Sequence, residues 1–436
     1  MKITLINPPN CGRSIPEEEY GITTLKMIFR GEPLALEMLA GNLGGHEVNI
    51  IDLKADPESF EGLFQSADLP HIVGFTGVTC EANTVIRLAR EIKSRLKKES
   101  PVIIVGGHHA SSDPGFFNCT GIDYIVVGLG KLSFKKCVDR LVAGDDPVGI
   151  PGVIATNPGR PLVFTARKCT QSDLVDGREP RYDLVKKHRD KYVMSGVGGK
   201  VGFVATAFGC THNCSFCSIP SITGGRYLTH SIDAIVRDIQ LLHDISLIRF
   251  VDANTFGDLT MAKALAQKLI SCGIEKKIVA DVRADTVVRD PGLMRLWQQA
   301  GLVAVVIGFE EIDDRRLIQM NKRSTLSKNV EALQILAEIG IRVVGDFIIA
   351  PDYDYADFER LEKFIENAPI SLPIPSILTP LPGTALYRQC ETDLEITDLD
   401  YYTFSNAVLP TRLPKEEFYS LYSGLMKHLH THISEK

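Results

Sequence analysis

GCTHNCSFCS, residues 209–218, contains Cys210, Cys214 and Cys217, with three and then two residues between successive cysteines. The segment follows an apolar run at residues 202–207, which we expect to be a strand. The loop would then lie at the carboxyl end of a strand, where barrel folds carry out their chemistry. Three thiolates leave one iron of a 4Fe–4S cluster free, whereas clusters that only transfer electrons normally have four cysteine ligands. The spacing therefore predicts an iron–sulfur centre that can bind a further ligand.

Two other interpretations of the cysteines stay open on this evidence. A zinc site would need a fourth ligand, which His212 inside the loop could supply. The three thiols could also be ordinary core residues. A disulfide framework is not expected, because we predict a reducing compartment and only three of the ten cysteines are tightly clustered.

A series of alternating strands and helices follows the cysteine loop. We expect its later strands at residues 247–252, 278–282, 303–309, 343–349 and 376–379. One helix has a clear start at Asp290-Pro291, a capping residue followed by proline at the first helical position. Six strand–helix units fit an open, partial (β/α)6 TIM-type barrel better than a closed one of eight units. We place this barrel at residues 196–385.

The amino-terminal third of the chain shows the same alternation and predicts a separate α/β domain. Strands are expected at residues 3–6, 48–53, 72–78, 102–105 and 124–127, with helices filling most of the gaps. Residues 1–145 are therefore predicted to form a Rossmann-like or flavodoxin-like domain. Residues 146–195 look like a linker with a short hairpin around Asn157-Pro158-Gly159, and residues 386–436 like a small helical C-terminal region.

Composition limits the classes of partner. A length of 436 residues suggests two domains, and 44% hydrophobic with 23% charged residues is ordinary for a globular protein. The net charge of −6, with cations scattered among anions, argues against nucleic acid as a partner. No apolar run approaches the length of a membrane span, and the start MKITLINPPN has no signal peptide features. We therefore expect a cytoplasmic protein.

The cysteine motif, with Phe216 before its last cysteine, resembles the radical S-adenosylmethionine (SAM) superfamily over about residues 196–385. FVDANTF, DVRAD and VVIGFEEIDDRRLIQMNKR resemble later motifs of the same barrel. The resemblance implies that SAM binds the free iron, and that the residues near SAM are Phe216, Asp252, Asn254, Arg283 and Glu310. Glu311 stands where serine is common in the family. The alternative role of Asp252, Arg283 and Glu310 is an ion pair at the barrel rim.

Residues 1–145 resemble the cobalamin-binding module that precedes the barrel in one class of radical SAM methylases. INPP, VGFTGVT, VGGHHAS and IVVGLGK all fall at strand ends, where open parallel sheets bind ligands. The cobalamin contacts implied by the resemblance are Pro8, Pro9, Thr76, Gly77, Thr79, Gly106, Gly107, His108, His109, Gly128 and Gly130. For the two histidines an ordinary turn position is an equal alternative. For the whole domain the alternative is a module that binds nothing, or a nucleotide.

Two departures from the cobalamin pattern stand out. Relatives usually have G-E-G-E in the last loop, where this chain has Gly128-Leu129-Gly130-Lys131. The chain also lacks the D-x-H-x-x-G motif whose histidine replaces the lower axial base of cobalamin, because the equivalent stretch is Asp52-Leu53-Lys54-Ala55-Asp56. The resemblance therefore implies a cobalamin without a histidine ligand from that loop.

Together the resemblances imply a cobalamin-dependent radical SAM methyltransferase. It would methylate an unactivated carbon through a 5′-deoxyadenosyl radical and methylcobalamin, with electrons from a donor such as ferredoxin or flavodoxin. The substrate could be a peptide or protein side chain, a lipid, or a small metabolite. A cyclase or rearrangement enzyme with the same cofactors is the first alternative, and a non-catalytic cobalamin or metal sensor is the second.

Two later segments have less certain roles. TPLPGTALY, residues 379–387, matches a turn of cobalamin-dependent relatives but reads as a proline-fixed turn without a chemical role. The aromatic residues Tyr401, Tyr402 and Phe404 are expected to pack the tail against the barrel.

Overall fold

The computed structural model describes residues 1–22, 29–65, 68–194 and 199–433. The amino-terminal domain is built on one sheet in the order β3 (Glu47–Asp52), β1 (Lys2–Asn7), β4 (Ile72–Phe75), β5 (Val102–Val105), β6 (Tyr124–Val126) and β7 (Val153–Ala155). The first five strands are parallel and β7 is antiparallel to β6. The parallel strands have the flavodoxin order 2-1-3-4-5, so the switch point lies between β1 and β4.

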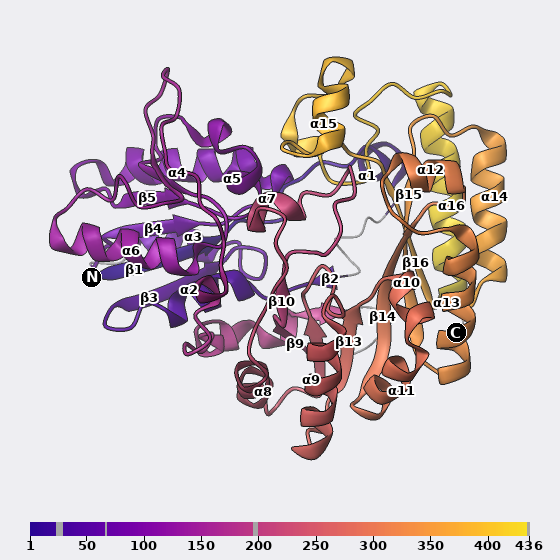
Figure 1. Cartoon of the computed structure of the whole chain (residues 1–436). Helices are drawn as coiled ribbons and strands as arrows, with labels where there is room; N and C mark the ends of the chain where they lie inside the picture. The colour runs from indigo at the N-terminus through magenta and orange to yellow at the C-terminus, as the bar shows by residue number, and fades with distance from the viewer. Residues whose placement is uncertain (23–28, 66–67, 195–198, 434–436) are drawn as a thin grey trace.

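Helices cover both faces of this sheet, as Figure 1 shows at its left. They are α2 (Leu34–Gly41), α3 (Ser59–Gln65), α4 (Ala82–Leu96), α5 (His108–Ser112) and α6 (Gly130–Ala143). Helix α4 buries one face against the sheet, because Val85, Leu88, Ala89 and Ile92 are all buried. The Rossmann-like prediction for this domain is therefore correct.

The hairpin predicted around Asn157 is not formed among the described residues. Its first half is β7, which joins the edge of the first sheet, but no strand follows the turn. The turn is held by Asn118 instead: Asn157 N donates to Asn118 Oδ1 at 2.7 Å, and Asn118 Nδ2 donates to the carbonyl of Arg160 at 2.8 Å. Because these partners come from a distant loop, local sequence did not reveal them.

The second domain contains six parallel strands that stand in chain order. These are β9 (Val201–Val204), β12 (Leu247–Phe250), β13 (Lys277–Asp281), β14 (Leu302–Glu310), β15 (Arg342–Ile349) and β16 (Leu372–Ile377). Strands β9 and β16 are the two edges of the sheet, so the barrel is open. The helices outside it are α8 (Ile232–Leu241), α9 (Leu259–Ser271), α10 (Ala284–Arg289), α11 (Pro291–Gln299), α12 (Asp314–Gln319), α13 (Leu326–Ile339) and α14 (Tyr355–Asn367). The partial (β/α)6 prediction is confirmed.

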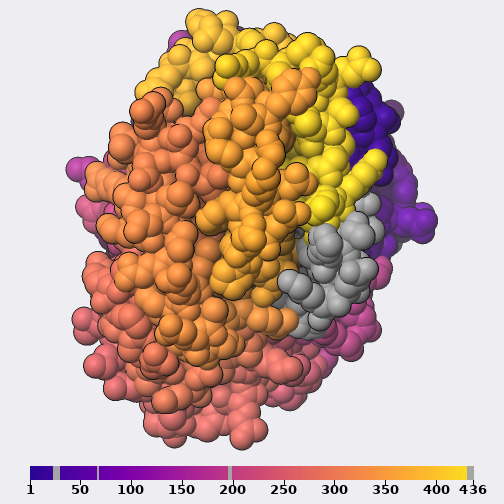
Figure 2. All heavy atoms as spheres, turned by 90° about the vertical axis from the view of Figure 1, so that its right-hand side faces the viewer, coloured from indigo at the N-terminus to yellow at the C-terminus, as the bar shows by residue number. Residues whose placement is uncertain are grey.

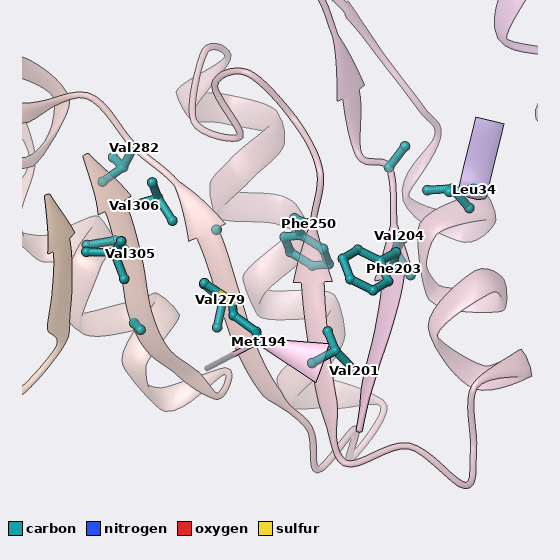
Figure 3. Close-up of a cluster of buried hydrophobic side chains, with 14 of the residues drawn as sticks. Leu34, Met194, Val201, Phe203, Val204, Phe250, Val279, Val282, Val305 and Val306 are labelled. Atoms are coloured by element: carbon teal, nitrogen blue, oxygen red, sulfur yellow. The ribbon is translucent and has the colours of Figure 1, made fainter. Parts of the chain in front are cut away.

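Buried side chains on neighbouring strands form the core of this domain. Figure 3 shows Phe203, Phe250, Val279 and Val305 on successive strands, all nearly inaccessible to solvent. Trp297 on α11 packs edge-on against Phe250, and its indole N–H donates to the carbonyl of Ala262. The tryptophan N–H therefore has a partner although the ring is buried.

The segment predicted as a linker holds the two domains together. Residues 182–191 form a 3-10 helix that carries Arg189, which is paired with the buried Glu32. Glu32 also accepts a hydrogen bond from Phe203 N on β9, at 2.6 Å, and burial raises its pKa to about 7. Tyr192 OH donates to Asp52 of β3 at 2.9 Å. A buried polar network thus ties the first sheet to the first barrel strand.

The C-terminal region includes α15 (Ala385–Cys390) and α16 (Lys415–Ile433). Tyr419 of α16 lies against Tyr20 of α1 (Ile15–Tyr20), with ring centroids 6.2 Å apart, and Figure 2 shows this yellow segment beside the indigo start of the chain. The expectation that the tail aromatics pack against the barrel is wrong: Tyr402 lies in the core of the amino-terminal domain, Tyr401 lies against Arg13, and Phe404 is exposed. No helix in the described part of the chain is long and apolar enough to cross a membrane.

Candidate active site

The cysteine loop leaves the barrel through a short ribbon formed by β10 (Ala207–Phe208) and β11 (Leu228–Thr229). Gly209, directly before the first cysteine, has φ 83°. A Cβ atom there would also collide with the carbonyl of Arg226. Only glycine fits this backbone without strain, which explains the first letter of the motif.

Backbone hydrogen bonds from two other parts of the barrel fix the loop. Ser215 N donates to the carbonyl of Met320 at 3.0 Å, and Leu386 N donates to the carbonyl of Ser215 at 2.9 Å. Asn321 Nδ2 donates to the carbonyl of Asn213 at 2.9 Å. The loop is therefore held in one conformation by the ends of α12 and the start of α15.

The three thiols lie on this fixed loop, partly buried and without a disulfide. Burial raises the pKa of Cys217 to about 11 and that of Cys214 above its usual range, while nearby Lys322 and Arg283 act to lower the latter. No three His, Cys, Asp or Glu side chains among the described residues are gathered as ligands of a single ion. Iron binds the cysteines as thiolates, so binding of a cluster would lower the pKa of these thiols. The positive charges of Lys322 and Arg283 would favour the negatively charged cluster.

Asp252 supports the loop from inside the protein. Its Oδ1 accepts hydrogen bonds from Thr206 N at 2.7 Å and Ala207 N at 2.9 Å, and its Oδ2 accepts one from Thr206 Oγ1. The carboxylate is 4% exposed, so these bonds occupy it. The expected rim ion pair is absent at this residue, because its partners among the described residues are neutral donors.

Asn254 offers an unused acceptor next to the loop. Its Nδ2 donates to Thr211 Oγ1 at 3.3 Å, while its buried Oδ1 has no hydrogen-bond partner within the described ranges. The backbone is fixed by Tyr227, whose OH donates to the Asn254 carbonyl at 2.9 Å. A buried acceptor without a partner is costly in an apo protein and fits a ligand that donates to it.

Glu310 and Glu311 point to opposite sides of β14. Glu310 pairs with Lys322 at 2.7 Å, and its φ of 66° places it in the left-handed region at a bulge of the strand. Its carboxylate folds over Gly308, where a Cβ would collide with it. Glu311 instead accepts a hydrogen bond from Tyr353 OH at 2.6 Å outside the barrel. Glu310 is therefore the residue that faces the barrel interior, and its strained backbone is typical of functional sites.

Arg283 joins the same group of charges. Its Nε donates to Asp285 at 2.8 Å, and its Nη2 donates to the carbonyl of Lys322 at 2.8 Å. Both Arg283 and Glu310 therefore take part in ion pairs at the rim, the alternative that the sequence left open. Phe216 is partly buried within the loop.

The expected cobalamin contacts lie at the carboxyl edge of the first sheet. Pro8 and Pro9 follow β1, and Thr76, Gly77 and Thr79 follow β4, on the two sides of the switch point. Gly106 and Gly107 follow β5, and Gly128 and Gly130 follow β6. Gly107 has φ 98°, and a Cβ there would lie 2.6 Å from Thr76 Oγ1. The loops after β4 and β5 therefore meet backbone to backbone.

The two histidines have different surroundings. His109 is fully buried, with its ring edge-on to Phe116 and Phe117 at centroid distances of 5.1 and 5.5 Å. Burial lowers its pKa to about 4, and neither ring nitrogen has a partner among the residues described. Its contacts are those of a packed core residue. His108 is partly exposed, and burial lowers its pKa.

The departures from the cobalamin pattern have structural explanations. Lys131 Nζ donates to the carbonyls of Leu174 and Val175 at 2.8 and 3.1 Å, so it supports the segment between the domains. Lys54 pairs with Glu81 at 2.6 Å. Both lysines are therefore already paired. Lys131 is not free to take the place of a glutamate of the G-E-G-E pattern, and Lys54 is not free to take the place of the histidine of the D-x-H-x-x-G pattern.

The two motif-bearing edges face each other, as the centre of Figure 1 shows. Ser112 on α5 is hydrogen-bonded to Ser221 on α7 (Ile219–Thr223), which follows the cysteine loop, at 2.8 Å. Gly383 of the TPLPG turn lies against Ser112, where an added Cβ would stand 2.7 Å from its carbonyl oxygen. The turn is therefore a contact between the domains.

Two groups near these edges escaped the sequence analysis. Asn406 hydrogen-bonds the backbone of Arg13 and Ile15 in the loop after β1, and no sequence motif around Asn406 indicates this role. Asp346, in the middle of β15, lies beside Glu310 and Lys322. Its one signal was a charged residue inside an apolar strand.

Comparison with known proteins agrees with this division of the chain. The B12 binding domain matches residues 22–138, and the Radical SAM superfamily matches residues 204–365. Hopanoid C-3 methylase from Methylococcus capsulatus is 31% identical over 403 residues, covering 90% of this chain and 75% of that protein. The anaerobic magnesium-protoporphyrin IX monomethyl ester cyclase of Synechocystis is 25% identical over 381 residues, covering 83% and 70%. The structure of the radical SAM methyltransferase TsrM from Kitasatospora setae, with cobalamin and a [4Fe-4S] cluster, superposes with a TM-score of 0.71 at 18% identity, covering 97% and 90%.

Proposed function

This chain belongs to the cobalamin-dependent radical SAM methyltransferases, and we propose that it methylates an unactivated carbon at the interface between its two domains. The observation that carries the proposal is the contact of the cysteine-loop helix α7 with the cobalamin-side helix α5, through Ser112 and Ser221. When bound, the cluster and SAM supply a carbon-centred radical and the corrin supplies a methyl group. The contact brings these two chemistries to one place.

The roles that we propose for the chain's own residues follow from their contacts. Cys210, Cys214 and Cys217 hold the cluster, and Asp252 positions their loop through Thr206. Asn254 supplies an acceptor to SAM. The remaining SAM contacts are Phe216, Arg283 and Glu310, the last held in place by Lys322.

On the other side, the loops after β1, β4, β5 and β6 would hold the corrin. Gly107 lets two of these loops approach closely, which supports a flat ligand lying across them. We keep His108 as a candidate contact and assign His109 to packing, because its ring lies between Phe116 and Phe117. No histidine from the loop after β3 would ligate the cobalt.

An apolar substrate is the class that the edge residues favour. Val251 follows β12, Val78 follows β4 and Phe404 lies beside the end of β16, and they are 43%, 42% and 44% exposed. These side chains are available for contact with an apolar substrate. Together with the hopanoid methylase among the relatives, this supports a lipid carbon over a peptide or polar metabolite. We propose an external reductant such as ferredoxin or flavodoxin.

The test is an anaerobic incubation of reconstituted protein with cobalamin, reductant, an isoprenoid lipid extract and SAM labelled in its methyl group. Label in a lipid product together with 5′-deoxyadenosine would support the proposal. Failure to form 5′-deoxyadenosine with any reductant would contradict it.

A second candidate is a cyclase or rearrangement reaction, favoured by the similarity to the anaerobic cyclase over 381 residues. The same incubation separates the two. A cyclase would form 5′-deoxyadenosine and a changed product without methyl label.

A further inference from the structure

The interior of the barrel carries charged side chains on adjacent strands. Phe309 and Phe347 stack on each other, and Phe347 contacts Phe364 of α14, which marks the outer face of β14 and β15. Neighbouring residues in a strand point to opposite faces, so Asp346 points inward. Asp346 lies opposite Gly308, and the Glu310 carboxylate and Lys322 Nζ fill the space that a side chain at Gly308 would take.

Charge pairing inside the barrel is incomplete. Arg249 on β12 pairs with Asp281 on β13, and Lys322 pairs with Glu310 on β14. Asp346 on β15 has neither a hydrogen bond nor an ion pair from any residue within the described ranges. The next strand, β16, has the sequence LPIPSI and contributes no titratable group. Asp281 and Glu310 each have a cation, whereas Asp346 has none among the described residues.

The surroundings of Asp346 explain why it stays protonated without a ligand. Burial and the neighbouring carboxylates Glu310 and Asp281 raise its pKa to about 8, although Arg249 and Lys322 act in the opposite direction. Asp346 is partly buried, and a carboxyl group in such a place without a cation reduces the cost of an unpaired charge by keeping its proton. A cation bound next to Asp346 would stabilise the ionised carboxylate, so the group would lose its proton.

The Glu310–Lys322 pair lies between the cysteine loop and Asp346. On one side Met320 and Asn321, next to Lys322, hydrogen-bond the cysteine loop, and on the other side the pair lies beside Gly308, which is opposite Asp346. A ligand lying over the cysteine loop and the pair therefore reaches Asp346. SAM differs from most nucleoside ligands in carrying a fixed positive charge on its sulfur. We propose that the Asp346 carboxylate is the counter-charge for the sulfonium of SAM, an inference that rests on the proposed function.

The proposal couples SAM binding to the loss of a proton. Asp346 releases its proton to solvent when the sulfonium arrives. The affinity for SAM therefore increases with pH, from the lowered pKa that Asp346 has in the complex up to its pKa of about 8 in the free protein. Below that window the group stays protonated in both states, and above it the group is already ionised. S-adenosylhomocysteine has the same amino acid and adenosine parts but no positive sulfur, so it should release no proton from Asp346.

The experiment is isothermal titration calorimetry of the anaerobic, cluster-loaded protein with SAM and with S-adenosylhomocysteine, in buffers of different ionisation enthalpy. At pH 7 we expect SAM to release close to one proton more than S-adenosylhomocysteine does. The affinity for SAM relative to S-adenosylhomocysteine should rise about 25-fold between pH 6 and pH 8. The subtraction cancels the amino group that the two ligands share.

Asp346→Asn should abolish the difference in proton release and lower SAM affinity about tenfold, leaving S-adenosylhomocysteine affinity and iron content unchanged. Asp352→Asn, which removes an exposed carboxylate just beyond the same strand, is the matched control and should behave like the wild type. Equal proton release by the two ligands in the wild type would overturn the proposal. Binding of neither ligand would overturn the proposed function itself.

Discussion

Ile15 N donates a hydrogen bond to Asn406 Oδ1 at 2.7 Å, across 391 residues of sequence. The same side chain donates from Nδ2 to the carbonyl of Arg13 at 2.9 Å, and it is fully buried. Thr403 Oγ1 donates to the same carbonyl at 2.9 Å. The C-terminal segment therefore sets the position of the loop that follows β1 and carries Pro8 and Pro9.

We expect Asn406→Ala to weaken cobalamin retention before it affects the iron–sulfur cluster. The variant leaves Ile15 N and the Tyr401 carbonyl without the partner that Asn406 provides, each at a cost of about 1–3 kcal/mol, and loosens the loop after β1. The measurement is the corrin and iron content after gel filtration, with Asn367→Ala, an exposed residue at the end of α14, as the control. Loss of iron equal to the loss of corrin would show a general folding defect instead.

Cys214→Ala should abolish 5′-deoxyadenosine formation and remove most of the bound iron. The reason is that a cluster needs all three thiolates of the loop, while the backbone bonds of Ser215 keep the apo fold. Corrin retention should be close to that of the wild type. Cys272→Ala, an exposed cysteine at the end of α9, is the matched control, and an equal loss of iron there would refute the assignment.

Glu310→Ala should weaken SAM binding about 10- to 100-fold, because it removes a charged hydrogen-bonding group and leaves Lys322 unpaired. Iron content should not change, since no thiol is touched. The measurement is SAM affinity by equilibrium dialysis under anaerobic conditions. Glu338→Ala on the exposed face of α13 controls for loss of charge, and unchanged affinity in Glu310→Ala would remove this residue from the site.

Gly107→Ala should reduce corrin affinity tenfold or more. An alanine at φ 98° is strained by about 1–3 kcal/mol, and its Cβ would push the loops after β4 and β5 apart. A corrin absorption titration measures the effect. Gly44→Ala is the control, because a Cβ there meets no atom within 4 Å. Corrin binding that survives the Gly107 change would argue against a ligand across these loops.

The sequence by itself determined the strands of the two sheets, whereas the strand order of the first sheet came from the structure, because the sequence fitted both a Rossmann-like and a flavodoxin-like domain. Alternating apolar runs and the start of α11 at Asp290 depend on local periodicity and capping, which are visible in short windows. The cysteine spacing and the glycine before it are equally local, because one thiol loop and one left-handed residue fix them. The strands and the start of α11 were predicted correctly for that reason.

The tertiary structure alone decided which charged side chains are available to a ligand. Asp252 is occupied by Thr206, Lys131 by two carbonyls, and Asp346 is left without a cation, and each outcome depends on a partner far away in sequence. The clamp of Asn406 on Ile15 is the extreme case. Long-range hydrogen bonds and charge balance arise only when distant segments are packed together, so no local pattern can record them.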